Sequence, residues 1–208
     1  MAGGKDRIID AAERLFAENG FHGVSMRMVA EAAPIGLGTL THHFASKESL
    51  LEAVVLRRSA ELSRTQFDAI TSVSQPGVQA LVVAFVESYL RLIESGDAGW
   101  RSYTRLIAVF ATDPRWSMLM SQQFEELGRE MIARLRHEVP NLNQDAAVHA
   151  YSNLVSLVMG LFASNGILDQ FSDGRLSSKH VRPNVEALIC FAVGGIQALS
   201  TMNARTHS

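Results

Sequence analysis

Apolar residues in the first fifty positions recur every three or four residues, with charged residues on the opposite side. This period predicts short amphipathic helices rather than strands. Asn19-Gly20 ends the first helix, because glycine is common just past a helix end. Pro34 ends the second, because it disfavours the helical conformation at Ala33. The pattern therefore predicts helices over about 5–18, 26–32 and 37–43.

Serine residues mark where two of the helices begin. Ser25 and Ser46 each precede an apolar-periodic run, and a serine at such a position accepts a hydrogen bond from the first helical turn. Leu40 and Phe44 are apolar positions around the third helix, so we expect them to face inward. Three short helices with a tight turn between the second and third are typical of a helix-turn-helix, whose last helix enters the major groove of DNA.

The organisation changes after residue 50. Long amphipathic segments follow one another, separated by short breakers such as Gln75-Pro76-Gly77, without strand-like alternation. These segments predict helices near 47–71, 77–94, 100–111, 115–138, 144–170 and 183–202. The expected fold class is all-α: an N-terminal three-helix helix-turn-helix domain over 1–50, then a C-terminal helical bundle over 51–208, with about nine helices in total.

Charge does not favour nucleic-acid binding. The chain has 208 residues and a formal net charge of −2. Residues 1–50 carry five Lys or Arg against six Asp or Glu, so this segment has no excess of positive charge, and the chain has no basic tail. An argument for DNA binding must therefore come from the placement of particular residues.

Other features of the sequence limit the location and the chemistry. The apolar run Leu154–Phe162 is too short to span a bilayer and polar residues follow it, and the first ten residues lack the pattern of a secretory signal. We therefore expect a cytoplasmic protein without membrane contact. Cys190, in an apolar run, is expected to be a buried and unreactive thiol.

Enzyme motifs are absent from the sequence. It has no His-Glu-x-x-His, no Gly-x-Ser-x-Gly, no phosphate-binding glycine loop and no cluster with metal-ligand spacing. His42 and His43 are adjacent, so they point to different sides of a helix and cannot chelate one ion well. We expect no catalytic residues, no metal and no cofactor.

Four stretches together resemble the N-terminal domain of the tetracycline-repressor (TetR) family. They are RIIDAAERLFAENGF (7–21), VSMR (24–27), GTL (38–40) and HFASKESLL (43–51). The resemblance covers roughly residues 7–55. It implies a DNA-binding transcriptional regulator whose first domain binds DNA, and whose second domain, over 51–208, binds a ligand and forms a dimer.

The departures from the family pattern fall in the turn and the third helix. Gly36 replaces the usual serine cap, Leu37 stands where a polar or basic residue is common, and Thr41 replaces a tyrosine that contacts phosphate in the family. A glycine cap weakens a helix by only a few tenths of a kcal/mol. These departures therefore bear on which bases are contacted, and how tightly, rather than on the fold.

The positions that remain suggest a set of DNA contacts. Arg27 can reach a phosphate, and Lys47 with the backbone N–H groups at the start of the fourth helix forms another anion site. Leu37 can touch a thymine methyl group, and Gly38 allows close approach of the backbone. The candidate DNA-binding residues are Arg27, Leu37, Gly38, Thr39, Thr41, His42, His43 and Lys47, each of which has a solvated helix face as its alternative interpretation; for His43 packing is a further alternative.

The second half of the chain is rich in methionine and aromatic residues at helical spacing. Core packing explains most of them. The resemblance adds a pocket for a small, largely apolar effector, such as an aromatic or acyl compound, and such side chains suit one. The candidate ligand-binding residues are Tyr89, Tyr103, Trp116, Met120, Phe124, Tyr151 and Phe162.

The helices near 144–170 and 183–202 are apolar nearly all round, so each must be covered on more than one side. Gly160, Ala163, Gly194 and Gly195 permit close helix contact. We expect a homodimer through a four-helix interface, as the family has. A twofold dimer places two third helices about one DNA turn apart, which predicts a palindromic operator.

The sequence thus predicts a ligand-responsive repressor, released from double-stranded operator DNA by its effector. The alternative is a helical adaptor with the same fold that has lost specific DNA binding. The departures at Leu37 and Thr41 and the mild acidity keep this alternative open.

Overall fold

A computed structural model describes residues 4–97, 99–110, 118 and 121–205 of the chain. The residues in these ranges form ten helices and no strand. The helices are α1 (Gly4–Asn19), α2 (Met26–Ala32), α3 (Leu37–His43), α4 (Lys47–Thr71), α5 (Val78–Ile93), α6 (Gly99–Phe110), α8 (Glu125–Glu138), α9 (Gln144–Ala163), α10 (Ile167–Phe171) and α11 (Val181–Arg205). The all-α expectation is confirmed.

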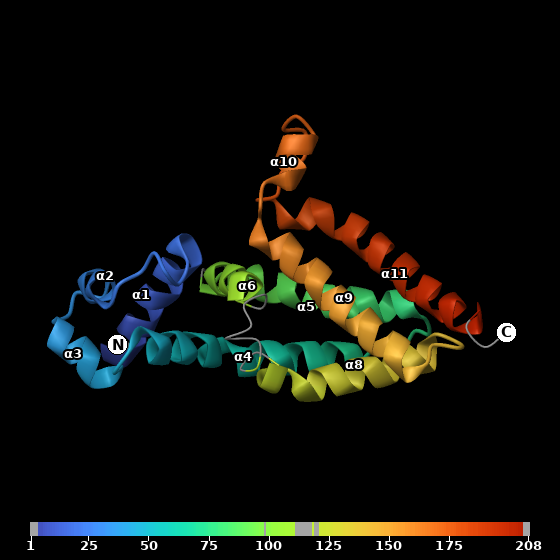
Figure 1. Cartoon of the computed structure of the whole chain (residues 1–208), viewed down its shortest axis with the longest axis horizontal. Helices are drawn as coiled ribbons and strands as arrows, with labels where there is room; N and C mark the ends of the chain where they lie inside the picture. The colour runs from blue at the N-terminus through green and yellow to red at the C-terminus, as the bar shows by residue number, and fades with distance from the viewer. Residues whose placement is uncertain (1–3, 98, 111–117, 119–120, 206–208) are drawn as a thin grey trace.

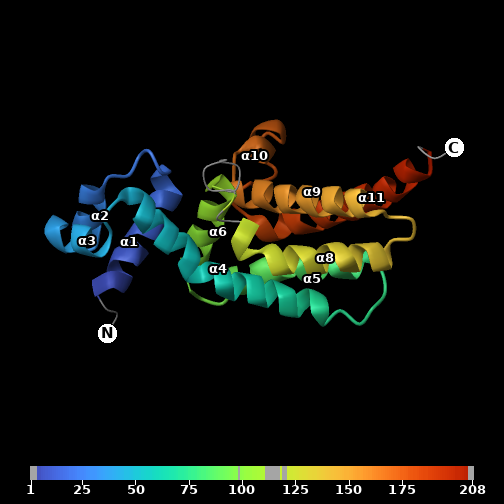
Figure 2. The ribbon, with the colours of Figure 1, turned by 60° about the horizontal axis from the view of Figure 1, so that its bottom comes forward.

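The molecule is elongated, with the helix-turn-helix at one end (Figure 1). Helices α1, α2 and α3 lie together there, and α4 runs from this cluster into the body. Within the body α4 packs against α5 and α8, and α9 lies beside α11 on the other side (Figure 2). Helix α6 packs against both α1 and α9, so it connects the helix-turn-helix with the body.

Local caps explain why the helices of the first domain begin where the sequence predicts. The Ser25 side chain accepts a hydrogen bond from the backbone N–H of Met28 at 3.2 Å. Ser46 and Ser49 form a reciprocal capping box at the start of α4, with each side chain accepting from the other residue's backbone N–H, at 3.0 and 3.1 Å. Leu40 and Phe44 are buried, as expected for inward anchors of α3.

The predicted helix over 144–170 is wrong, because α9 ends at Ala163 and α10 is a separate short helix. Ser164 and Gly166 adopt left-handed backbone conformations, with φ of 48° and 78°. The Ser164 hydroxyl donates to the carbonyl of Ser178 at 2.9 Å, and such local bonds compete with helix continuation. The start of the helix predicted over 115–138 falls partly outside the described residues, and α8 begins only at Glu125.

Two expectations about apolar segments also need correction. Cys190 is exposed, because α11 is covered by α5 and α9 on one side only. The helices Gln144–Ala163 and Val181–Thr201 are long and apolar enough to cross a membrane by length and composition, contrary to the sequence expectation. That test is weak evidence, since helices of a soluble core or interface pass it too.

Candidate DNA-binding and ligand-binding sites

Helix α3 presents most of its surface outward at the end of the molecule (Figure 1). Its buried residue is Leu40, while Leu37 is 46% exposed and Gly38 and Thr39 are exposed as well. A methyl group added to Gly38 would meet no atom within 4 Å. The helix therefore has an open face on which another macromolecule can lie.

The polar side chains on α3 differ in whether they are available to contact DNA. The Thr41 hydroxyl donates to the carbonyls of Leu37 and Gly38, both at 3.1 Å, so its donor is turned back onto its own helix. His42 and His43 are exposed in the last turn, with ring centroids 5.8 Å apart. Thr41 must rotate before its hydroxyl can donate to DNA.

The two candidate cations have protein partners. Arg27 forms an exposed ion pair with Glu31 at 3.3 Å. Lys47 Nζ donates to the carbonyls of Phe21 and Val24 at 2.8 and 2.9 Å, and it lies 4.3 Å from the centre of the Phe21 ring. An ammonium group has three donors, so Lys47 ties the α1–α2 connection to the start of α4 and keeps one N–H for another acceptor.

A charged cluster joins the helix-turn-helix to the body. Glu13 of α1 is 2% exposed, and its Oε2 accepts from Arg57 Nη2 at 2.6 Å and from Arg58 Nε at 3.1 Å. Arg57 also pairs with Asp10. Because both arginines belong to α4, these bonds fix the orientation of α1 on α4.

The same cluster reaches α6 through Arg58. Its Nη1 lies 2.6 Å from Asp97 Oδ2, and its guanidinium lies 4.9 Å from the centre of the Trp100 ring. Burial lowers the pKa of Arg58, but hydrogen bonds and charges from Asp97 and Glu13 outweigh this and raise it. A methyl group on Gly99 would lie only 1.9 Å from Arg58 Nη2, so a larger residue where α6 begins would displace the Arg58 guanidinium.

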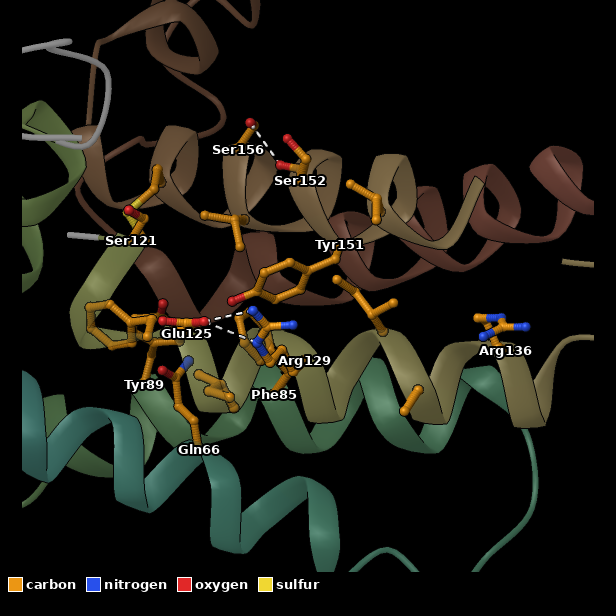
Figure 3. Close-up of a pocket in the computed structure, with 18 of the residues that line it drawn as sticks. Gln66, Phe85, Tyr89, Ser121, Glu125, Arg129, Arg136, Tyr151, Ser152 and Ser156 are labelled. Carbon is orange, nitrogen blue, oxygen red and sulfur yellow. Dashed lines mark hydrogen bonds and ion pairs between the residues drawn. The ribbon is translucent and has the colours of Figure 1, made fainter. Parts of the chain in front are cut away.

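The body contains a cavity of about 770 Å³ (Figure 3). It lies between α4, α5, α6, α8 and α9. Its apolar and aromatic lining comprises Phe85, Tyr89, Ile107, Phe124, Leu127, Ile132, Val148, Tyr151, Val155 and Met159. This volume and this lining are typical of a small-molecule site.

Three of the expected ligand-binding residues line this cavity: Tyr89, Phe124 and Tyr151. The Phe85 ring makes edge contacts with Tyr89 and Tyr151, with centroids 5.7 and 6.3 Å away. Burial raises the pKa of Tyr151 to about 12 and also raises the pKa of Tyr89. Both phenols therefore stay neutral at pH 7 and can donate hydrogen bonds.

Two other expected ligand-binding residues, Tyr103 and Phe162, do not line it. Tyr103 is fully buried, and its hydroxyl donates to the carbonyl of Val55 at 3.1 Å, so it joins α6 to α4. Phe162 is buried behind Tyr89, with ring centroids 5.1 Å apart. Trp116 and Met120 lie outside the described residues. Tyr103 and Phe162 have the right chemistry, but they face the core.

The sequence reasoning missed the polar lining of the cavity. These residues are Gln66, Ser121, Glu125, Arg129, Arg136, Gln144, Ser152 and Ser156. Gln66 is fully buried in α4, and neither Oε1 nor Nε2 has a hydrogen-bond partner. A glutamine at an inward helical position, among apolar neighbours, was the available signal.

Helices α9 and α11 keep an uncovered apolar face. Phe191 is 71% exposed, and methyl groups added to Gly160, Gly194 or Gly195 would meet no atom within 4 Å. These glycines therefore do not serve close packing within the chain. Phe191 and these glycines leave apolar surface of α9 and α11 uncovered within the chain.

The sequence matches two family models that fit this architecture. Residues 8–54 match "Bacterial regulatory proteins, tetR family", and residues 83–195 match "Tetracyclin repressor-like, C-terminal domain". The first covers the helix-turn-helix, and the second covers most of the body with its cavity.

Individual proteins are similar over shorter stretches. HTH-type transcriptional regulator UidR of Escherichia coli (strain K12) is 47% identical over 53 residues, which are 26% of this chain and 27% of UidR. An uncharacterized HTH-type transcriptional regulator of Mycobacterium tuberculosis (strain ATCC 25618 / H37Rv) is 35% identical over 102 residues, 48% of this chain and 50% of the relative. The matches thus span between a quarter and a half of these curated relatives.

Similarity of fold extends over nearly the whole chain. The crystal structure of transcriptional regulator FadR from Bacillus subtilis in complex with stearoyl-CoA superposes with a TM-score of 0.65, at 15% identity. The alignment covers 91% of this chain and 98% of FadR. The fold and the exposed helix-turn-helix define a DNA-binding transcriptional regulator. The chain belongs to the TetR family.

Proposed function

We propose that this regulator represses transcription as a homodimer on a palindromic operator, and that a small, largely apolar effector releases it. The observation that carries the proposal is the placement of the two sites. The open face of α3 lies at one end of the chain, the cavity lies in the body, and the Glu13–Arg58 cluster joins them. An effector that changes the body can therefore change the orientation of α3.

The proposed DNA contacts are Arg27, Leu37, Gly38, Thr39, Thr41, His42, His43 and Lys47. Arg27 and Lys47 neutralise phosphates only if a phosphate competes with Glu31 or takes the remaining Lys47 donor. Leu37, Thr39 and His42 have exposed side chains on α3 and contact base edges. We keep the division into a DNA-binding domain, 1–50, and a sensing and dimerisation domain, 51–208, as part of the proposal.

The dimer forms through the uncovered faces of α9 and α11. Exposed apolar area of this kind is costly in water and is typical of an interface. The glycines Gly160, Gly194 and Gly195 then let the helices of a second copy approach closely. Covering these faces with another copy also accounts for the two long apolar helices. We further propose that the protein is cytoplasmic and is not an enzyme.

The effector acts by binding one arrangement of the dimer better than the other. The cavity lies beside α4, and α4 carries Arg57 and Arg58, which hold α1. A ligand that moves α4 or α6 changes the spacing of the two α3 helices. Because both must fit one face of the duplex, a small change in spacing weakens operator binding.

The proposal is tested by measuring affinity for DNA from the promoter of the protein's own gene, by fluorescence anisotropy at two salt concentrations. We expect specific DNA to bind at least about a thousandfold more tightly than random DNA. Affinity for both falls as salt rises, because phosphate contacts release counterions. Equal affinity for specific and random DNA at low salt would leave the adaptor alternative as the better one.

A further inference from the structure

Gln66 is an unusual member of the cavity lining because its side-chain amide is buried without a partner. The residue is fully buried, and its Oε1 and Nε2 have no hydrogen-bond partner. Buried polar groups in native proteins are nearly always hydrogen-bonded, so an exception needs an explanation. Its place in the lining supplies one, since a ligand group in the cavity can take up both atoms.

The surroundings of Gln66 indicate what that group is. Figure 3 shows the Gln66 amide entering the cavity from α4, on the side opposite to the Tyr151 ring of α9. The Tyr89 phenol lies near the Gln66 amide: burial raises the pKa of Tyr89 and hydrogen bonding with Gln66 opposes that rise, but the pair does not reach full hydrogen-bond geometry. A carboxamide offers both donors and an acceptor, and a neutral phenol offers a donor and an acceptor. No charged group is needed to match them, so the fitting ligand group is a neutral hydroxyl or carbonyl.

The other end of the cavity carries positive charge. Arg129 and Arg136 lie seven residues apart on α8, which places them on one face at roughly 10 Å along the axis. Glu125 holds Arg129 at 2.7 Å. Arg136 donates instead to the neutral Gln144 at 3.0 Å, and it has no carboxylate partner among the described residues. Arg136 therefore keeps its charge for an anion.

Figure 3 shows the Glu125–Arg129 ion pair between Gln66 and Arg136, and because each charge has the other as its partner this section needs no charged ligand group. The rest of the lining includes the apolar side chains of Phe85, Leu127, Ile132 and Val155. Burial of an apolar body there supplies most of the affinity, while the polar ends fix its direction. Figure 3 shows Gln66 and Arg136 well apart in the drawn site, Gln66 toward α4 and Arg136 near the end of α8.

We propose that the effector is an elongated amphipathic anion whose apolar body ends in a neutral hydroxyl or carbonyl group. Gln66 binds the neutral group at the buried end, and Arg136 binds the anionic group at the exposed end. This inference rests on the proposed ligand-responsive function and specifies the class of molecule that it needs.

The test is isothermal titration calorimetry of the full chain with three probes: ω-hydroxydodecanoate, dodecanoate and dodecanol. The wild-type protein should bind ω-hydroxydodecanoate about tenfold or more tightly than dodecanoate, because dodecanoate leaves Gln66 unpaired. Equal affinity of the two carboxylates, or no binding of any probe at millimolar concentration, overturns the proposal.

Two variants locate the ends of the ligand. Gln66→Met keeps the length of the side chain and removes the amide, so it should abolish the preference for the hydroxyl and retain dodecanoate binding. Arg136→Gln should weaken both carboxylates by a similar factor and leave dodecanol unchanged. Arg134→Gln, on the same helix but outside the lining, is the matched control and should change none of the three. A preference that survives in Gln66→Met overturns the assignment of Gln66, and the wild-type comparison stands even if that variant does not fold.

Failure of this inference is separable from failure of the proposed function. Promoter-DNA binding by the same preparation is measured by fluorescence anisotropy. Loss of the probe preference with intact specific DNA binding overturns only the ligand class. If the protein prefers ω-hydroxydodecanoate as expected but does not bind promoter DNA specifically, only the proposed binding to an operator is overturned.

Discussion

The carboxylate of Glu13 in α1 accepts a hydrogen bond from Arg58 Nε in α4, at 3.1 Å. Glu13 is almost completely buried and also accepts from Arg57. Arg58 in turn holds Asp97, which precedes α6. Glu13 of the helix-turn-helix is thus fixed by α4, and Arg58 of α4 also holds the residue that precedes α6; both of these helices border the cavity.

Glu13→Gln tests the energetic weight of this junction. The change leaves two partly buried guanidinium groups with one fewer negative partner, and breaking a pair whose carboxylate is buried is costly. We expect the free energy of unfolding to fall by roughly 3 kcal/mol, measured by urea denaturation. Glu31→Gln is the control, because it removes the exposed pair with Arg27 and should cost less than about 1 kcal/mol. Equal losses in the two variants would contradict the structural role of Glu13.

Asp97 makes the same junction sensitive to acid. The hydrogen bond from Arg58 holds the pKa of Asp97 below its ordinary value, with help from the backbone N–H of Gly99. A carboxyl whose pKa is lower in the folded state stabilises that state above the unfolded pKa, about 3.9. This contribution is lost as pH falls through the lower, folded-state pKa.

Asp97→Asn should therefore lower the melting temperature near pH 7 and have progressively less effect below about pH 4. Thermal unfolding of the wild type and the variant at a series of pH values measures the difference. A difference in melting temperature that is constant from neutral pH to about pH 3 would exclude a role for the Asp97 charge.

The variant Lys47→Met distinguishes a structural role of Lys47 from a contact with DNA. Its ammonium ties the α1–α2 connection to α4 and lies over the Phe21 ring. Lys47→Met keeps the apolar stem and removes the donors, so the melting temperature should fall. If the third donor also binds a phosphate, the slope of log affinity against log salt should flatten by about 1. A lower melting temperature with an unchanged slope would leave Lys47 as a structural residue only.

The sequence predicted the first domain well because its signals are local. Ser25, Ser46 and Pro34 set helix ends within a few residues of themselves, and α2, α3 and α4 begin and end where the pattern indicates. The break at Ser164 escaped prediction because its bond goes to Ser178, which a local pattern cannot indicate.

The residues that line the cavity were predicted less well, because the direction in which a side chain points depends on how helices distant in the sequence pack together. Tyr89 and Tyr103 have the same chemistry and similar helical surroundings. Only Tyr89 reaches the cavity, because Tyr103 is turned toward Val55 of α4. Gln66 escapes prediction because aromatic and methionine residues are the usual sequence signal for an apolar pocket, whereas an unpaired buried amide is visible only in the structure.

Phe191→Glu tests the proposed dimer. Phe191 is 71% exposed on α11, and a carboxylate there would have to be buried without a partner when two copies meet. We expect the wild type to be a dimer by size-exclusion chromatography with light scattering, and the variant to be a monomer. Phe171→Glu is a matched control, because Phe171 is 81% exposed but lies on α10, outside the α9–α11 face. A variant of Phe191 that stays dimeric would place the interface elsewhere.

Gly38→Ala separates folding from DNA binding on α3. A methyl group at this position meets nothing within the chain, and alanine is favoured over glycine within a helix by up to about 1 kcal/mol. The free energy of unfolding should therefore rise, as measured in urea. Affinity for promoter DNA should fall about tenfold by fluorescence anisotropy, because the methyl group occupies space that the DNA needs if the backbone of α3 approaches it closely. A more stable variant with undiminished DNA affinity would remove Gly38 from the proposed contacts. A less stable variant would show instead that the backbone of α3 at Gly38 is not regular helix.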